Sequence, residues 1–211
     1  MFEEILSENA ISVIESLGTR LETFYLAGGT GLALQLGHRK SNDFDFFSDK
    51  AFNTDAMLSL ISPDKVFFSS AGSLHCEIQG ILISLLFYNA PLVHAPLTWR
   101  GVRLSHCEDI IAEKIKTISQ RGAKKDFIDI YAAVKMKYAI PDICSFFKQR
   151  FKGFDINIYH VLKSLVFFED AEKEPSPVML LSGKEWEWDT IKSFFIENIE
   201  LFEKELIQEF C

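Results

Sequence analysis

The chain has 211 residues, of which 48% are hydrophobic and 25% are charged, a balance that is typical of a folded globular protein and argues against disorder. Its formal net charge of −8 opposes non-specific adhesion to nucleic acid or to an anionic membrane, although a local basic channel is compatible with it. The acidic N-terminus lacks the layout of a signal peptide, and no apolar run approaches the roughly 20 residues that span a bilayer. We therefore expect a cytoplasmic protein with no membrane partner.

The cysteines and histidines show no spacing typical of a metal site. The four cysteines are widely scattered, and the five histidines form no His-x-x-x-His pair. These patterns argue against a zinc site and against a disulfide framework, so we expect free thiols and a metal ion that is held by oxygen ligands.

Helices and strands alternate in the first half of the chain. Apolar residues at helical spacing predict a helix over residues 6–17, which Gly18 ends. A strand at residues 24–27 then leads into a short helix at residues 31–36. The remaining elements predicted for this half are a strand through Phe44, Phe46 and Phe47, a helix at residues 54–61, and strands at residues 65–70, 74–79, 81–88 and 102–104.

Beyond Ser105 the apolar period becomes helical through most of the remaining sequence. Gly122 ends a first helix in this half, and a second helix begins near Lys125. A proline-containing loop at residues 172–177 precedes a long amphipathic helix at residues 191–210. We therefore predict an α+β fold, in which a domain with a mixed sheet at residues 1–105 is followed by a helical bundle at residues 106–211.

Asp43 and Asp45 lie two residues apart on the strand predicted around Phe44 and Phe46. Their side chains therefore point to one side of the sheet while the two phenylalanines point to the other. Mg²⁺ prefers oxygen ligands, usually one or two carboxylates completed by water and substrate phosphate, so this pair is suited to hold it. Taken alone, an Asp-x-Asp is more often a solvated strand face, and that alternative stays open.

Gly28-Gly29-Thr30 joins a strand to the N-terminus of a helix. Missing side chains allow close approach of a ligand, and unpaired amides at a helix N-terminus attract phosphate. The sequence contains neither a Walker A loop nor the Gly-x-Gly-x-x-Gly fingerprint at this point. The order of strand, Gly-Gly-Thr, short helix, basic turn and Asp-x-Asp strand instead resembles the signature of DNA polymerase β-like nucleotidyltransferases.

The basic turn before the aspartates contains Arg39, Lys40 and Ser41. Its two cations would reach triphosphate oxygens if the two elements pack together, and Ser41 would order the turn. A solvated basic turn is an equally good interpretation.

Lys114 falls within the apolar arc of the first helix in the second half, and Arg121 shares its side. The arc consists of Ile110, Ile111, Ile115 and Ile118. A cation on an apolar face is costly unless it is paired or binds an anion, so we expect a functional use, with snorkelling of the long side chain as the alternative.

Asp126 and Asp129 lie three residues apart on the next predicted helix. They would position Lys114 or Arg121 by ion pairing, or they would contact the substrate directly. For Asp126, stabilisation of the helix dipole is the alternative.

Longer stretches of the chain resemble one known family. Residues 25–47, from Tyr-Leu-Ala-Gly-Gly-Thr to Asp-Phe-Asp-Phe-Phe, resemble the first motif of the AbiEii/AbiGii toxin-like nucleotidyltransferases. Residues 108–114 and 121–129 resemble the downstream motif of that family, and residues 163–175 are similar to its stand-alone members. The resemblance covers nearly the whole chain and implies an N-terminal nucleotidyltransferase domain followed by a helical bundle.

The resemblance also implies roles for the residues named above. By similarity, the triphosphate of an NTP would be bound by Gly28, Gly29 and Thr30. From their position and charge, Arg39, Lys40 and Ser41 of the basic turn and Arg121 are further candidates for nucleotide contacts. Asp43 and Asp45 would hold Mg²⁺ or Mn²⁺. Lys114 with Asp126 or Asp129 would complete the catalytic site.

One departure concerns a third carboxylate, which many polymerase β-like enzymes place on a later strand. Residues 81–87 offer only Ser84 there, and Glu77 is a weak substitute. Without a third acid, the base that deprotonates the acceptor must be another group, such as Asp126 or Asp129.

The family resemblance implies transfer of a nucleoside monophosphate from NTP to an acceptor hydroxyl, with the tRNA 3′ end as the favoured acceptor. It further implies an abortive-infection toxin whose antitoxin is encoded nearby. Two alternatives stay open: a catalytically silent nucleotide-binding module that acts through a protein or RNA partner, and a transferase that modifies protein hydroxyls.

Overall fold

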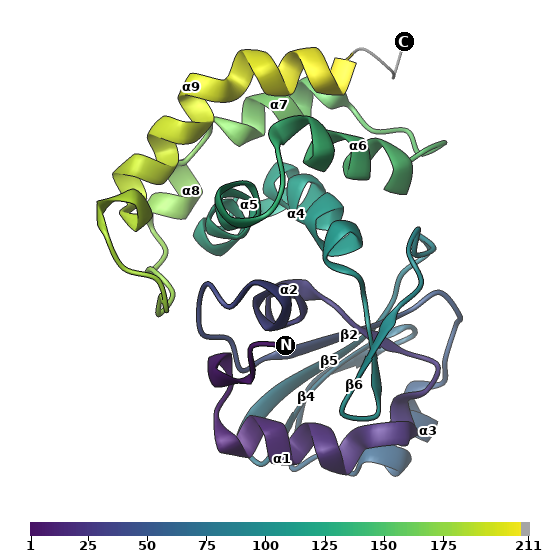
Figure 1. The fold of residues 1–211 in the computed structure, drawn as a ribbon. Coiled ribbons are helices and arrows are strands. Elements are labelled where there is room, and N and C mark those ends of the chain that lie inside the picture. Colours follow the sequence, from purple (N-terminus) through teal and green to yellow (C-terminus); the bar gives the residue numbers. More distant parts are fainter. Residues whose placement is uncertain (208–211) are drawn as a thin grey trace.

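The structure is a computed structural model that describes residues 1–207, and it consists of a half that contains a β-sheet and a half built of helices (Figure 1). The strands are β1 Tyr25–Leu26, β2 Phe44–Ser48, β3 Lys65–Ser70, β4 Ser73–Ile78, β5 Ile81–Phe87, β6 Leu97–Trp99 and β7 Val102–Leu104. They form one sheet in the order β3-β4-β5-β2-β1-β7-β6. The pairs β2–β5 and β1–β7 are parallel and the other neighbouring pairs are antiparallel, so the sheet is mixed.

Helices cover both sides of this sheet and continue into the second half of the chain. They are α1 Glu8–Leu17, α2 Gly28–Leu36, α3 Thr54–Ile61, α4 Cys107–Arg121, α5 Lys124–Met136, α6 Ile140–Arg150, α7 Ile158–Leu165, α8 Glu169–Glu172 and α9 Trp188–Ile207. Short 3₁₀ helices lie at Glu3–Ile5, Gly18–Leu21 and Lys184–Trp186. Across residues 1–207, each helix is too short or too polar to cross a lipid bilayer.

Alternation along the central strands separates an apolar face of the sheet from a polar one. Phe44 and Phe46 of β2 and Ile83 of β5 are buried, and they pack in one core with residues of α1. Asp45 and Ser84 occupy the intervening positions and therefore face the opposite side, toward the helical half. The sheet thus presents its polar face to the second half of the chain.

Helix α2 lies between the two halves and contributes to both of their apolar cores (Figure 1). Ala33 and Leu34 belong to the core of the sheet, whereas Leu32 and Leu36 belong to the core of the helical half. Since α2 also packs against α4 and α5, the start of this helix is held next to both of them.

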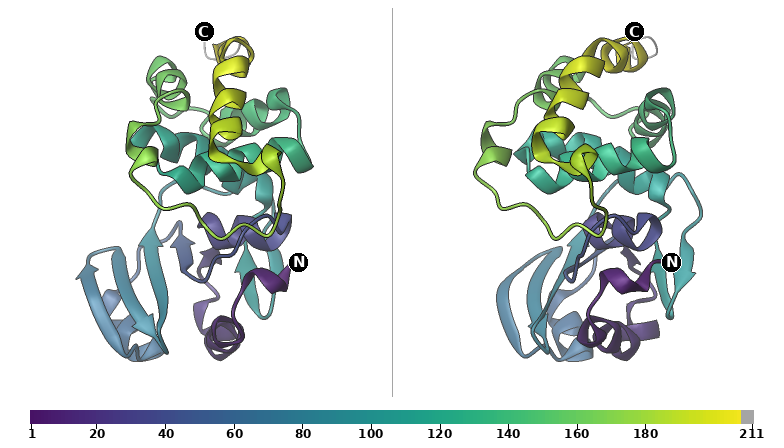
Figure 2. Two further views of the ribbon diagram at one scale, coloured as in Figure 1. Left: turned by 90° about the vertical axis from the view of Figure 1, so that its left-hand side faces the viewer. Right: turned by 60° about the vertical axis from the view of Figure 1, so that its left-hand side comes forward.

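The helical half is held together mainly by aromatic side chains. Phe127, Phe147, Phe195 and Phe202 are fully buried there. The ring of Phe195 on α9 makes an edge contact with that of Phe127 on α5, with ring centroids 5.3 Å apart. Helix α9 packs on α6 and α7 and forms the outer layer of this half (Figure 2).

The predicted α+β fold class is confirmed by the mixed sheet and the helical second half. Strand β6 was not predicted, because it has only three residues and its pairing depends on a tight turn at Arg100 and Gly101, where φ is +46° and +79°. Asp43 precedes β2 rather than lying on it. The division at residue 105 stays a prediction, and residues 208–210 of the last predicted helix, like Cys211, lie outside the described residues.

Replacing Phe195 by Ala should lower the free energy of unfolding by about 3–5 kcal/mol, because it leaves a cavity among the rings that join α9 to α5. Urea unfolding followed by circular dichroism measures the change. Ile196→Ala is the matched control, because Ile196 is 57% exposed on the same helix and its truncation should cost far less. Equal losses in the two variants would contradict the packing of α9 described here.

Candidate active site

A pocket with a cavity volume of about 440 Å³ lies between the polar face of the sheet, the start of α2 and one side of α4. From the first half of the chain its lining includes Gly28, Gly29, Thr30, Arg39, Ser41, Asp43, Asp45, His75, Ser84 and Tyr88. From the second half it includes Glu113, Lys114, Lys116, Arg121, Lys125 and Arg150. The pocket therefore combines carboxylates, a helix N-terminus and several cations.

The Gly-Gly turn brings the start of α2 against Asp45. Gly28 has φ of +62°, and a Cβ atom there would lie 2.7 Å from Asp45 Oδ2. A Cβ atom at Gly29 would collide with the guanidinium of Arg39. Only glycine therefore fits at position 28 without strain. At position 29 a side chain would overlap the buried guanidinium of Arg39.

Three hydrogen bonds join this turn and the residue before it to the segment that carries the aspartates. The backbone N–H of Ala27 donates to the carbonyl oxygen of Asp45 at 2.9 Å. The hydroxyl of Thr30 donates to the carbonyl oxygen of Asp43 and shares a 2.6 Å hydrogen bond with the Ser41 hydroxyl. Thr30 and Ser41 thus order the backbone on which the aspartates stand, and both residues also line the pocket.

Asp43 and Asp45 both line the pocket, as the spacing predicts. Burial raises the pKa of Asp43 above its ordinary value, Lys125 opposes this rise, and the neighbouring Asp45 adds to it. Two carboxylates that share a pocket in this way disfavour each other's charge, and a divalent cation between them would relieve that repulsion.

Lys114 is almost completely buried and is held by two aspartates of α5. Its Nζ atom donates to Asp126 Oδ1 at 2.6 Å and lies 2.7 Å from Asp129 Oδ2. Asp126 also accepts from Arg121 Nε at 2.9 Å. The predicted ion pairing of these aspartates with Lys114 and Arg121 is therefore present in the structure.

Asp129 has further partners from the basic turn before β2. Arg39 Nε donates to its Oδ1 atom at 2.7 Å and Arg39 Nη2 donates to its Oδ2 atom at 3.0 Å. His38 Nε2 lies 2.8 Å from the same Oδ1 atom. We call the group of Arg39, Lys114, Arg121, Asp126 and Asp129 the buried charge network, although Arg121 reaches the surface with a side chain that is 52% exposed.

The charges of this network can be counted from the pKa shifts. Burial alone would raise the pKa of Asp129, but Arg39 and Lys114 outweigh it and hold that pKa well below its ordinary value of 3.8. Burial lowers the pKa of His38 despite the opposing effect of Asp129, so its imidazole is neutral at pH 7. Three cations then stand against two carboxylates, which leaves one positive charge.

The network presents this charge to the pocket. Arg39, Lys114 and Arg121 line the pocket, whereas Asp126 and Asp129 are fully buried behind them and do not line it. The aspartates therefore act on a pocket ligand through the cations they hold, and the surplus positive charge favours an anion.

Of the other residues considered from the sequence, Lys40 and Glu77 lie outside the pocket and Ser84 lies inside it. Lys40 is exposed and lies outside the pocket, and its backbone N–H donates to the carbonyl oxygen of Val178. Glu77 pairs with Lys65 at 2.9 Å and does not line the pocket either. Ser84 lies beside Asp45 in the parallel pairing of β2 with β5, at the position where a third carboxylate was sought.

Several pocket residues were not predicted from the sequence. His75 alternates with buried residues along β4, so the strand pattern could have placed it on the polar face. Its Nδ1 atom lies 3.1 Å from the Ser84 hydroxyl. Glu113 accepts from the Tyr88 hydroxyl and from Arg150 Nε, both at 2.8 Å, and Arg150 has no local signal because its partners are 37 or more residues away.

A family described as nucleotidyl transferase AbiEii toxin, type IV TA system, matches residues 90–207. The chain belongs to this family. The Aquifex aeolicus (strain VF5) protein aq_aa25 is 32% identical over 199 residues, which cover 90% of this chain and 93% of the relative. That alignment extends the relationship well beyond the family match, into the half that contains the sheet.

Two Helicobacter pylori crystal structures match nearly the whole of this chain. One is described provisionally as a nucleotidyltransferase and gives a TM-score of 0.52 at 17% identity, with 95% of this chain and 97% of the other covered. JHP933 gives a TM-score of 0.49 at 17% identity, with 95% and 96% covered. The resemblance that the sequence motifs indicate is confirmed, and the AbiEii protein is a nucleotidyltransferase, an enzyme class that generally uses a divalent metal ion and an NTP.

Asp129→Asn should destabilise the AbiEii protein by about 3–5 kcal/mol, because Arg39 and Lys114 would lose the carboxylate that compensates their buried charges. Urea unfolding at pH 7 measures the loss. Asp155→Asn is the control, since Asp155 is exposed and its replacement should change stability by less than about 0.5 kcal/mol.

The same pair of proteins should reveal the lowered pKa of Asp129. A carboxyl group whose pKa is lowered on folding stabilises the protein above its unfolded pKa, and this contribution is lost as the pH falls toward the folded value. The gap between wild type and Asp129→Asn should therefore be full above about pH 4 and shrink below it. A gap that stays constant down to pH 3 would contradict the assignment.

Proposed function

We propose that this nucleotidyltransferase moves a nucleoside monophosphate from NTP to an acceptor hydroxyl, with the tRNA 3′ end as acceptor and Mg²⁺ as the metal ion. The observation that carries the proposal is the composition of one pocket. Asp43 and Asp45, the N-terminus of α2 and the cations of the buried charge network all line it. Two carboxylates suit a metal ion, and the remaining groups suit the phosphates that the ion accompanies.

Asp43 and Asp45 fit Mg²⁺, or Mn²⁺, by their donor chemistry. Both offer carboxylate oxygens to the same pocket, and their proximity contributes to the raised pKa of Asp43. A bound ion would supply neutralisation of the charge that develops on the phosphoryl oxygens. Gly28 favours the same arrangement, because its missing side chain lets the Asp45 carboxylate lie against the start of α2.

The triphosphate would be bound by the N-terminus of α2 and by cations that line the same pocket. Gly28, Gly29 and Thr30 form the first turn of α2, whose unpaired amides favour an anion. Lys114 and Arg121 line the same pocket, with their positions fixed by the two buried aspartates. Lys40 lies outside the pocket and has no part in this proposal.

Asp126 and Asp129 serve in this proposal as positioning residues. Each accepts from two cations, and the pKa of each is lowered although burial by itself would raise it. A carboxylate in that state is a poor proton acceptor, and neither group reaches the pocket. Their contribution to the reaction is to hold Lys114, Arg39 and Arg121.

His75 is a better candidate than Asp126 or Asp129 for the base that deprotonates the acceptor hydroxyl. It lines the pocket and contacts Ser84, which is the β5 neighbour of Asp45. Its imidazole therefore lies next to the position where a third carboxylate was sought, and imidazole is the side chain that most often serves as a general base. Glu113 also lines the pocket, but one of its oxygens accepts from the Arg150 guanidinium, whereas the ring nitrogens of His75 contact the hydroxyls of Ser73 and Ser84.

An RNA acceptor is supported by where the basic residues lie. The chain carries a formal net charge of −8, yet Lys114, Lys116, Arg121, Lys125 and Arg150 gather on one side of the pocket. This concentration favours a polyanion at the pocket and disfavours one elsewhere. The description of the matching family as a type IV toxin supports growth arrest as the biological outcome and an antitoxin encoded nearby.

The decisive experiment is incubation of the purified protein with Mg²⁺, total cellular RNA and each α-labelled NTP in turn. We expect label in a tRNA-sized band, and we expect Asp43→Asn/Asp45→Asn to reduce it by about 10³-fold or more, because the metal ligands are lost. Asp49→Asn is the matched control, since Asp49 is exposed just beyond β2 and does not line the pocket.

Each outcome of this experiment distinguishes one functional hypothesis from the others. Wild-type labelling by the double variant, with its fold intact by circular dichroism, would refute the proposed metal site. Label in a protein band would assign a protein hydroxyl as acceptor. NTP binding without any label would indicate a catalytically silent module.

His75→Ala should lower kcat by about 10²-fold to 10⁴-fold while leaving NTP affinity nearly unchanged, because a base acts on the acceptor and not on the bound nucleotide. Single-turnover labelling together with NTP titration measures the two quantities. His160→Ala is the control, since His160 is an exposed residue of α7. If kcat is unaffected in His75→Ala, the base is another group.

A further inference from the structure

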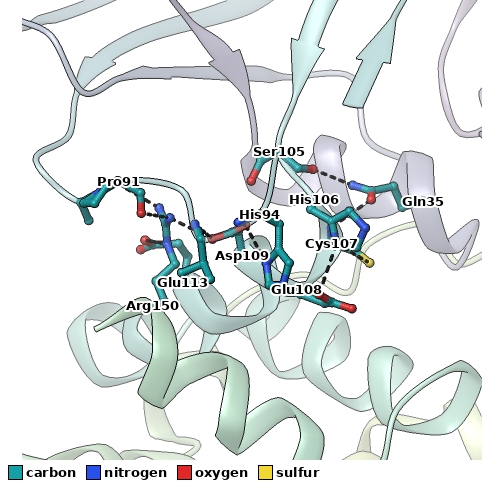
Figure 3. Close-up of polar contacts among 12 residues, drawn as sticks. Gln35, Pro91, His94, Ser105, His106, Cys107, Glu108, Asp109, Glu113 and Arg150 are labelled. Carbon is teal, nitrogen blue, oxygen red and sulfur yellow. Dashed lines mark hydrogen bonds and ion pairs between the residues drawn. The ribbon is translucent and has the colours of Figure 1, made fainter. Parts of the chain in front are cut away.

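Three metal-ligand side chains meet outside the active-site pocket, at the junction between the sheet and the helical half (Figure 3). His94 lies in the segment between β5 and β6, whereas His106 and Glu108 lie at the start of α4. Their ligand atoms are all within 4.8 Å of one another. None of the three residues lines the pocket, so the cluster is distinct from the aspartate pair.

Asp109 determines which nitrogen of His94 carries a proton. This buried carboxylate accepts from the backbone N–H groups of Val93 at 2.8 Å and His94 at 3.0 Å. It also lies 3.1 Å from His94 Nδ1, and a carboxylate can only accept at that contact. The hydrogen-bond network therefore assigns the proton to Nδ1 and leaves the lone pair of a neutral imidazole on Nε2.

That lone pair points at a carboxylate. His94 Nε2 lies 2.8 Å from Glu108 Oε2, a contact that either a second proton on His94 or a metal ion shared by the two residues would satisfy. A metal ion would also engage His106, whose ligand atom lies within 4.8 Å of both, whereas a proton on His94 would not. His106 Nδ1 is 3.5 Å from the same Glu108 oxygen, too far for a good hydrogen bond, and the two imidazole rings are 5.2 Å apart.

We propose that His94, His106 and Glu108 bind one Zn²⁺ ion, with solvent as the fourth ligand. Two imidazoles and one carboxylate are a donor set that zinc uses. The Nδ1–H group of His94 already donates to Asp109, which is the outer hydrogen bond that metal-bound histidines typically make. This differs from the sequence expectation of oxygen ligands alone, because the fold brings together residues that no ligand motif connects.

Zinc requires only a small adjustment of the cluster. Tetrahedral coordination separates neighbouring ligand atoms by about 3.3 Å, so the His94–Glu108 contact must widen by roughly 0.5 Å. All three ligand atoms already lie within 4.8 Å of one another, so no pair has to close by more than about 1.5 Å. The side chains of His94 and Glu108 are 32% and 20% exposed, which leaves them room to move and leaves solvent a path to the fourth position.

A metal ion here would fasten the segment before β6 to α4. The same segment is already held from the helical half, because Arg150 donates to the carbonyl oxygen of Pro91 at 2.6 Å and to Asp109 at 3.0 Å. Zinc would therefore add a link between the two halves and raise thermal stability. The proposal does not depend on nucleotidyl transfer, and its test needs no turnover.

The test uses the full-length protein, stripped of metal and titrated at neutral pH with Zn²⁺ against a chromophoric chelator. We expect one equivalent to bind with micromolar or tighter affinity, Co²⁺ to give the intense visible absorption of a four-coordinate site, and zinc to raise the Tm. His106→Ala should weaken zinc binding by about 10²-fold or more. His106 makes no side-chain capping bond to α4, so this variant should fold.

Two control variants identify the site. His160→Ala, which removes an exposed histidine of α7, should bind zinc as wild type does, and so should Asp43→Asn/Asp45→Asn. Absence of stoichiometric binding by the wild type would overturn the proposal. So would zinc binding that survives His106→Ala or that is lost in the double aspartate variant, since either result would place the ion elsewhere.

Discussion

The arrangement of the candidate active site depends on the pairing of Lys114 with Asp126 and Asp129. Three charged groups buried together are tolerated only when each is compensated, because the desolvation of an unpaired ion costs several kcal/mol. Lys114 comes from α4, the aspartates come from α5, and Arg39 reaches Asp129 from the turn before β2. The requirement for charge compensation therefore fixes three segments relative to one another, including the segment that leads to Asp43 and Asp45.

The same pairing explains how Lys114 and Arg39 can line a pocket while their side chains stay buried and fixed in position. Lys114 and Arg39 are buried, so a ligand meets side chains whose positions are already set and pays little conformational entropy to order them. His38 stays neutral beside Asp129 because burial lowers its pKa, which prevents a fourth positive charge from accumulating. The surplus charge that remains is small and directed at the pocket.

Sequence patterns predicted the parts of the site that depend on local geometry. Lys114 falls on an apolar helical arc, and Gly28 and Asp45 have the spacing of a known motif, so each could be identified before any contact was known. Arg39 was assigned to phosphate, and its bond to Asp129 could not be foreseen because 90 residues separate the two. Arg150 and the pairing of His94 with Glu108 are equally invisible in the sequence, since they are created by the packing of α4 and α6 against the segment before β6.

Helix α2, which is shared by the two apolar cores, also opposes any movement that would part the two halves. Parting the halves like a hinge would expose Leu32 and Leu36, at roughly 1.5–3 kcal/mol for each side chain, and would separate Arg39 from Lys114 as well. The shape of the pocket is therefore set by packing that any opening about α2 would have to break. Rigidity of the wall between the halves follows from the position of one short helix in both apolar cores.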